Sequence, residues 1–176
     1  DASQFYLSYA RGNKEPKRAD YLANPEVRPE RLDDFELGWK YNKQNFILRA
    51  NLYYMFYNDQ LVLTGDLDDV GNPIADNIGQ SYRLGLEVDA AIRFSDKITW
   101  QPNFALSVNK NIDKLFEFDG ELTDFGNTDL AYSPGFIAAS NLNYEPIRNL
   151  KLSWLAKYVG QQYMSNIEHP DSKLDA

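Results

Sequence analysis

Few side chains in this sequence have the type and spacing of a reactive site. The 176 residues contain a single histidine, His169, and no cysteine. A Ser–His–carboxylate site would have to use His169, which stands before Pro170 in a segment without strand patterning. Histidine–cysteine metal clusters are excluded, and the sequence has no glycine-rich phosphate loop. We therefore expect no catalytic residue, no resident metal and no cofactor, and we interpret the chain as a non-enzyme.

Carboxylates are the commonest charged groups, with 26 acidic against 18 basic residues and a net charge of −8. This balance argues against nucleic acid as a partner, because phosphate binding requires a basic patch. The run Asp66-Leu67-Asp68-Asp69 offers oxygen ligands to a hard cation, but it lacks the EF-hand spacing and the terminal glutamate, so a solvated loop is preferred. A second acidic segment, 111–134, is compatible with a ligand-gripping loop or a folded cap, and its spacing does not decide between them.

Elsewhere, polar and apolar residues alternate one by one, which is typical of β-strands. In the clearest segment one face is wholly apolar, through Phe46, Leu48, Ala50, Leu52, Tyr54 and Phe56. The alternation predicts seven strands: Ser3–Arg11, Asp33–Tyr41, Phe46 to about Gln60, Gln80–Phe94, Ile98–Lys110, Gly135–Tyr144 and Leu150–Gly160. Several exceed the roughly five or six residues of an average strand, and they reach the roughly 9–11 that a tilted membrane-spanning strand needs.

The connections alternate between short turns and long loops. The expected short turns are 42–45, 95–97 and 145–149. The expected long loops are Gly12–Leu32, Gly65–Asn77 and Asn111–Pro134, followed by the tail Gln161–Ala176. Turn parity predicts these opposed pairs: Tyr41 with Phe46, Phe94 with Ile98, Tyr144 with Leu150, Gly38 with Arg49 and Ser140 with Trp154. Pro102 predicts a bulge, because proline removes a donor from the ladder of hydrogen bonds.

Alternation alone does not say which face is inside. A soluble barrel or sandwich has its apolar face inward, whereas a membrane barrel has it outward in lipid and a polar face around a wet lumen. Long strands, aromatic residues at both ends of the apolar faces, and short turns sorted to one end favour the membrane. We therefore predict an all-β fold, an antiparallel up-and-down transmembrane β-barrel, of which 1–176 form a single segment of about seven strands.

Two groups of polar residues are candidates for contact with other molecules. Residues expected at the external mouth, where a small-molecule ligand would enter, are Tyr57, Asp59, Arg83 and Asn109. Residues expected to face the lumen, towards a permeating ligand or a domain inside the barrel, are Arg49, Glu87, Asp89 and Arg93. Their alternating signs favour mutual pairing across strands as the interpretation of the second group.

Several motifs, in order along nearly the whole chain, resemble the barrel of TonB-dependent outer-membrane receptors. They are Lys14-Glu15-Pro16, the segment Pro29–Gly38, the segment Asn51–Gly65, the segment Ser81–Glu87, and the segment Tyr158–Tyr163. The resemblance implies a barrel of about 22 strands in the outer membrane of a Gram-negative bacterium, with a plug domain inside it and an inner-membrane energy-coupling protein as partner. The chain shows no plug domain, and we expect it to be an internal piece of the barrel, near but not at the C-terminus.

The resemblance implies that the loops and wall serve energy-coupled uptake of a scarce nutrient, such as an iron chelate, a vitamin or a glycan. One alternative is a soluble ligand-binding β-barrel with the apolar face inside. The other is a passive outer-membrane pore or adhesin. Outer-membrane lipid is the expected partner of the apolar face in the membrane interpretation.

Overall fold

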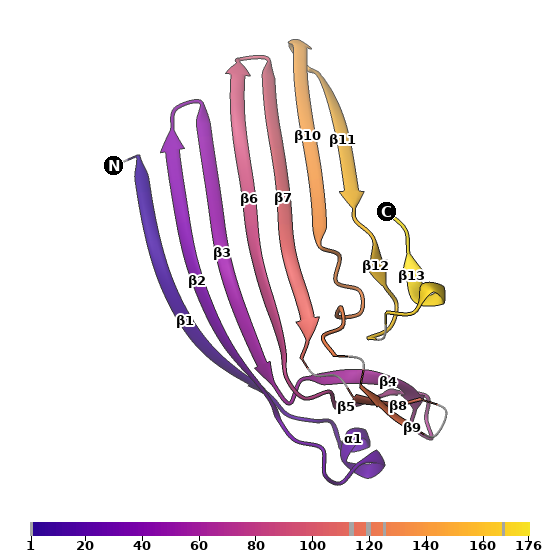
Figure 1. The fold of residues 1–176 in the computed structure, drawn as a ribbon. Coiled ribbons are helices and arrows are strands. Elements are labelled where there is room, and N and C mark those ends of the chain that lie inside the picture. The colour runs from indigo at the N-terminus through magenta and orange to yellow at the C-terminus, as the bar shows by residue number, and fades with distance from the viewer. Residues whose placement is uncertain (1, 113–114, 119–120, 125, 167) are drawn as a thin grey trace.

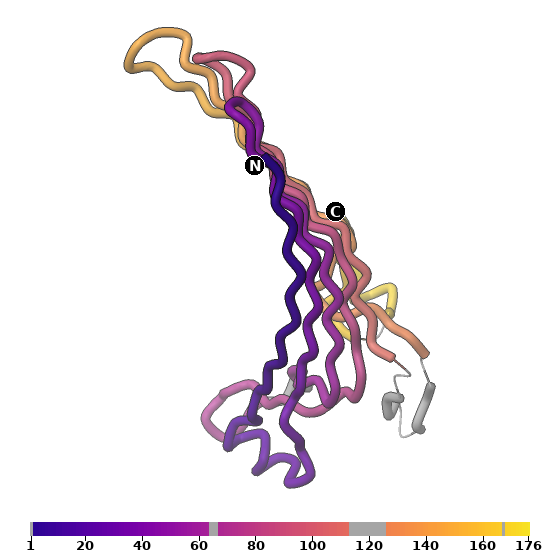
Figure 2. Tube along the Cα trace, turned by 90° about the vertical axis from the view of Figure 1, so that its left-hand side faces the viewer, coloured from indigo at the N-terminus to yellow at the C-terminus, as the bar shows by residue number. Residues whose placement is uncertain are grey.

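One antiparallel sheet of seven strands dominates the fold, in the order β1-β2-β3-β6-β7-β10-β11. It is seen in a computed structural model that describes residues 2–112, 115–118, 121–124, 126–166 and 168–176. The strands are β1 (Ser3–Lys14), β2 (Glu30–Lys43), β3 (Phe46–Asn58), β6 (Ser81–Ser95), β7 (Ile98–Asn111), β10 (Phe136–Ile147) and β11 (Leu150–Val159). The shortest has 10 residues and the longest 15, enough to cross a bilayer when tilted. Figures 1 and 2 show a curved single layer, which confirms the predicted up-and-down sheet.

The three short turns lie together at one end of the sheet, drawn at the top of Figure 1. The predicted pairs around them are wrong: Tyr41 lies opposite Leu48, and Ser140 lies opposite Ala156. The physical reason is that each hairpin closes with only two residues between its last paired positions, the tightest loop that antiparallel strands favour. Where the strands slip by two residues, each side chain stays on its face, so the predicted faces survive the wrong register.

Two further predicted pairs, in the first and third hairpins, fail for the same reason. Tyr144 lies opposite Leu152, and Gly38 lies opposite Asn51 in β3. At the second turn Ser95, and not Phe94, lies opposite Ile98, because the register shifts between Arg93 and Ser95. Beyond that shift β6 and β7 keep the register that the predicted pair required, from Arg93 opposite Thr99 to Ser81 opposite Asn111.

The bulge expected at Pro102 is absent. Pro102 lies opposite Ser140 of β10 in an unbroken register. On its other side the pairing with β6 stops after Asp89 and resumes in the same register at Ile92. The strand therefore accommodates the missing N–H by leaving two positions unpaired on one side, without inserting a residue.

The sequence predicted plain loops for the long connections, and this prediction is wrong, because the connections contain short helices and strands. These are α1 (Arg18–Ala23), β4 (Leu61–Leu67), β5 (Pro73–Asn77), β8 (Leu115–Phe118), β9 (Glu121–Asp124), β12 (Gln162–Tyr163), the 3-10 helix η1 (Pro170–Ser172) and β13 (Lys173–Leu174). The segment predicted as the loop Gly65–Asn77 belongs largely to the hairpin of β4 and β5. Residues 113–114, 119–120 and 125 of the second acidic segment, and the side chains of 115–118 and 121–124, lie outside the described residues. In the part of the chain that the structure describes, no helix is long and apolar enough to span a membrane.

One face of the sheet is apolar from edge to edge. A row that crosses six strands consists of Leu7, Leu37, Leu52, Leu86, Leu106 and Phe136. This face has no cover in the structure, and Leu7 exposes 80% of its surface. Among the described residues the buried apolar side chains are Val27, Leu61, Ile78 and Leu130, all in the long connections. The wall therefore has no core behind it, as expected for a surface that lipid covers.

Two tyrosines fix the pairing of the polar face by lying over glycines. Tyr6 lies directly opposite Gly38, and Tyr53 lies directly opposite Gly85. A Cβ atom added to either glycine would overlap the facing tyrosine ring. The large residue that fills the space at Gly38 is thus Tyr6 of β1 and not Arg49, as turn parity had suggested.

Candidate functional site

The polar face of the wall carries the predicted lumen residues in separate rows. Arg49 lies directly opposite Asp89, and their side chains form an ion pair of 3.3 Å that remains about half exposed. Glu87 is one row nearer the long loops and forms no ion pair with any described residue. Arg93 binds Asp96 of the adjoining short turn at 2.9 Å. The four residues therefore do not make one cluster.

The external end of the polar face brings together three of the four predicted mouth residues. Arg83 lies opposite Asn109, and its guanidinium carbon is 6.0 Å from the centre of the Tyr57 ring. Arg83 Nη1 donates a hydrogen bond to Ser133 Oγ at 3.4 Å. Asn109 is 6% exposed, and its Nδ2 donates to Ser107 Oγ at 2.8 Å. We call Tyr57, Arg83, Asn109 and Ser133 the mouth cluster.

The mouth cluster contains donor capacity that the protein leaves unused. Arg83 Nε is buried and has no hydrogen-bond partner among the described residues. On the far side of Met55, which lies between them in the register, Asp34 Oδ1 is likewise buried without a described partner. Buried polar atoms without partners are uncommon, so each is a place where a ligand atom, a water molecule or another domain can bind.

Asp59, the fourth predicted mouth residue, lies apart from the cluster. It follows β3, has a φ of 51°, and binds Arg28 Nη2 through Oδ1 at 2.7 Å. Its carbonyl oxygen accepts a hydrogen bond of 2.7 Å from Asn77 Nδ2. Asp59 therefore joins the first two long connections to each other.

Polar residues that the sequence interpretation missed form a buried layer next to the mouth cluster, on the side of the long connections. Ser81 and Asn111 lie opposite each other and are completely buried. Ser81 Oγ donates to Gln60 Oε1, and Asn111 Nδ2 donates to Thr128 Oγ1 at 3.0 Å. Both residues continue the polar alternation of Arg83 and Asn109 by one more step, so the same pattern had the signal to identify them.

Hydrogen bonds also join the long connections into a cap. Asp20 of α1 is 2% exposed and accepts from the backbone N–H of Ala75 in β5 at 2.8 Å. Asn24 Nδ2 donates to Asp76 at 3.0 Å. Thr128 Oγ1 donates to the carbonyl oxygen of Asn166 at 2.8 Å, which joins the third connection to the tail. The mouth cluster therefore lies between the sheet and a set of long connections that hydrogen bonds hold together.

The residues available for metal or catalytic chemistry are used in local structure. Asp68 accepts hydrogen bonds from the backbone N–H groups of Val70 and Asn72 at 3.0 and 2.7 Å. Hydrogen bonding, from the Asn72 side chain above all, holds the pKa of Asp68 below its ordinary value. His169 Nδ1 accepts from the Asp171 N–H at 3.2 Å at the start of η1. No group of three or more potential metal ligands occurs among the described residues.

The arrangement favours binding of anionic, oxygen-rich groups. A guanidinium with a free N–H, a phenol ring stacked on it and neighbouring hydroxyl and amide groups can hold carboxylate, catecholate or phosphate oxygens. Arg83 can donate in a fork while its guanidinium stays within cation–π distance of the Tyr57 ring.

Comparison with known proteins identifies the relatives of this wall. The sequence matches the family described as TonB dependent receptor-like, beta-barrel, over residues 1–174. The copper transporter OprC has a TM-score of 0.71 and 16% identity, over 98% of this chain and 25% of its own. The ferric yersiniabactin uptake receptor FyuA from Yersinia pestis has a TM-score of 0.66 and 19% identity, over 98% of this chain and 26% of its own.

A mutant of the ferric enterobactin receptor PfeA from Pseudomonas aeruginosa has a TM-score of 0.69 and 13% identity, over 99% of this chain and 29% of its own. At these identities the structures establish the fold alone. The chain spans about a quarter of the length of these solved chains. No curated protein sequence matches it.

Proposed function

Because the chain belongs to the TonB-dependent receptor β-barrel family, we propose that it forms wall and external loops of a receptor for energy-coupled uptake of a scarce nutrient. Members of this family are transporters of the Gram-negative outer membrane and not enzymes, so the exposed apolar face of the sheet lies in that membrane. The proposed cargo is an iron chelate, a vitamin or a glycan, and the iron chelate is the first class to test. The names of two similar proteins, a ferric yersiniabactin receptor and a ferric enterobactin receptor, support that order.

The observation that carries the proposal is the unused donor of Arg83 in the mouth cluster. A ferric chelate with carboxylate or catecholate oxygens would accept from Arg83 Nε and from the neighbouring polar groups as it passes the cap. Asp34 Oδ1 would accept from a hydroxyl or amide of the same ligand. Charge-assisted hydrogen bonds of this kind are roughly twice as strong as neutral ones.

The lumen residues have a separate proposed role. Glu87 has no described ion-pair partner and lies half-way along the polar face, so it is available to a plug domain inside the closed barrel. Arg49 and Asp89 neutralise each other within the wall. Coupling to an inner-membrane energy-coupling protein is proposed from the family and would act through a plug domain inside the barrel.

The test compares two arginines of the polar face in the full-length receptor. Arg83→Gln removes the unused donor, whereas Arg49→Gln, the matched control, removes a guanidinium already paired with Asp89. Uptake is measured in iron-starved cells with radioiron as ferric catecholate and ferric carboxylate chelates, and with cobalamin and maltodextrin as the other classes. We expect Arg83→Gln to reduce apparent affinity about tenfold or more for one chelate class, and Arg49→Gln to change it little.

Each contrary outcome has a clear meaning. Equal effects of the two substitutions would refute the role of the mouth cluster. Uptake that continues after a protonophore has collapsed the energy supply would identify a passive pore. Recovery of the full-length protein as a folded monomer in the soluble fraction would refute the receptor itself and favour a soluble binding barrel.

A further inference from the structure

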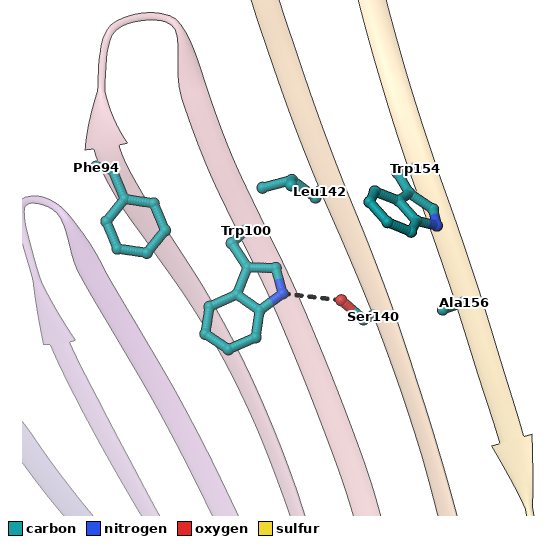
Figure 3. Close-up of a pocket in the computed structure, with 6 residues that line it drawn as sticks. All are labelled: Phe94, Trp100, Ser140, Leu142, Trp154 and Ala156. Atoms are coloured by element: carbon teal, nitrogen blue, oxygen red, sulfur yellow. Dashed lines mark hydrogen bonds between the residues drawn. The ribbon is translucent and has the colours of Figure 1, made fainter.

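A hollow of about 380 Å³ crosses β7, β10 and β11 on the apolar face (Figure 3). It is lined by Phe94, Trp100, Ser140, Leu142, Trp154 and Ala156, and we call it the tryptophan trough. Its origin is a row of small or flat side chains, because Pro102, Ser140 and Ala156 lie opposite one another across the three strands. The next row towards the short turns is bulky, with Trp100, Leu142 and Trp154 in register.

The lining is almost wholly apolar. Trp100 Nε1 donates to Ser140 Oγ at 2.8 Å, and Figure 3 shows this bond across the trough. Trp154 is 73% exposed and presents its ring on the other side of Leu142. The space therefore fits an apolar group such as the acyl chain of a lipid.

The short-turn end of the sheet and the β4–β5 hairpin at the other end differ in charge, and this difference would orient a lipid that has a charged headgroup. Each short turn carries a cation, Lys43, Lys97 or Arg148, and none of the three forms an ion pair with a residue that the structure describes. The acidic residues at the same turns are Asp96, which is paired with Arg93, and Glu145. The turns of Lys97 and Arg148 lie side by side, since the Glu145 N–H donates to the Lys97 carbonyl oxygen at 2.8 Å. The hairpin of β4 and β5 at the opposite end is acidic, with four aspartates between positions 61 and 77. An anionic headgroup is therefore attracted to the unpaired cations of the short turns.

The spacing between the cations and the trough matches an acyl chain. Ser140 lies opposite Pro102, which is five residues along β7 from Lys97, or about 17 Å at roughly 3.4 Å per residue. With a strand tilt of about 45° the depth is about 12 Å, inside the roughly 15 Å that one leaflet contributes to the hydrocarbon core. A headgroup at Lys97 and Arg148 therefore places the middle of its chain in the trough.

We infer that the tryptophan trough binds one acyl chain of an anionic glycerophospholipid of the periplasmic leaflet, whose phosphate lies against Lys97 and Arg148. The inference rests on the proposed function for its placement in the outer membrane, with the short turns on the periplasmic side. The bound lipid covers an apolar depression that bulk acyl chains would leave poorly filled. It is independent of the cargo, because the trough and the mouth cluster lie on opposite faces of the wall.

The test uses the full-length receptor purified in mild detergent with equimolar phosphatidylglycerol and phosphatidylethanolamine, and counts retained lipids by native mass spectrometry. The unmodified receptor should retain one phosphatidylglycerol. Ala156→Leu fills the trough and should lower retention at least about fourfold, the factor for losing one buried methylene. Ala50→Leu adds the same volume to the same face outside the trough and is the matched control.

A second variant tests the headgroup without altering the trough. Lys97→Gln with Arg148→Gln should abolish the preference for phosphatidylglycerol over phosphatidylethanolamine while some lipid remains bound. The inference is overturned by a receptor that retains no phospholipid, by equal retention in Ala156→Leu and Ala50→Leu, or by lipopolysaccharide or a second receptor copy in place of the phospholipid. A receptor that imports its cargo but retains no phospholipid refutes only this inference, whereas absence from the outer membrane refutes the proposed function.

Discussion

The close approach of Tyr53 to Gly85 gives a sharp prediction about how the wall is held in register. A Cβ atom at Gly85 would lie 2.5 Å from Tyr53 Cζ and 2.8 Å from Cε1, whereas carbon atoms in contact are separated by about 3.5–4.0 Å. The Gly85→Ala substitution therefore forces the ring to move by roughly 1 Å or to leave the glycine. Overpacking of this kind costs about 1–3 kcal/mol.

An opposing term makes the prediction more specific. Gly85 lies in the middle of β6 without a left-handed backbone angle, so alanine should also stabilise the strand by about 0.5–1 kcal/mol through backbone entropy. With both terms, Gly85→Ala should lower the free energy of unfolding by up to about 2.5 kcal/mol. In a Tyr53→Ala background the overlap is gone, and the same substitution should raise the free energy of unfolding by about 0.5–1 kcal/mol.

The assay is equilibrium unfolding of the full-length receptor in urea, in lipid vesicles, followed by tryptophan fluorescence. Gly12→Ala is the matched control, because no atom lies within 4 Å of a Cβ added at that strand position. It should be neutral or slightly stabilising. The argument is refuted if Gly85→Ala costs no more than Gly12→Ala, or if its cost is unchanged when Tyr53 is alanine.

Three further outcomes follow from the described contacts. Arg49→Gln should change the free energy of unfolding by less than about 1 kcal/mol in the same assay, because its ion pair with Asp89 leaves both side chains more than half exposed. Asp68 has a lowered pKa and so stabilises its turn at neutral pH; protection of the Asn72 N–H from hydrogen exchange should fall as the pH drops below about 4, and Asp68→Ala should abolish that pH dependence. Asn149 has a φ of 69°, so Asn149→Ala should destabilise the wall by about 1 kcal/mol in urea unfolding, whereas Asn149→Gly should not.

Strand positions and faces were predictable from the sequence because the strand period is exactly two and one face of each strand meets a single environment. Phe46, Leu48 and Leu52 share a face in the structure as the alternation required. The opposed pairs of the first and third hairpins were not predictable from parity, since a slip of two residues preserves every face. Between β6 and β7 parity predicted the register of the strands and missed only the shift at the turn. The contacts that select the register are local, such as the Tyr53 ring on Gly85.

The interior of the long connections was not predictable for a different reason. Helix α1 has six residues, too few to be stable alone, and it is held by the hydrogen bond of its buried Asp20 to Ala75, which is 55 positions away. Periodicity over such short segments carries little information. The structure of these connections depends on contacts between residues far apart in the sequence, and local sequence patterns do not show such contacts.

The candidate site was predictable in part. Alternation placed Tyr57, Arg83 and Asn109 on one face at one end, and the structure brings these three together. Asp59 lies at the same end but apart from these three, because its backbone turns out of the strand at a φ of 51°, which ends the alternation. Ser133 was missed because it belongs to an irregular segment with no pattern of its own.

The hydrogen bonds between the long connections have a practical consequence for receptor engineering. Asp20 binds the second connection, Arg28 forms an ion pair with Asp59, and Thr128 binds the tail, so the conformation of each loop depends on its neighbours. A loop grafted singly from another receptor would arrive without the partners that shape it. Exchange of recognition between such proteins is therefore expected to succeed when the loops are transplanted together as a set, on a barrel whose strands can stay unchanged.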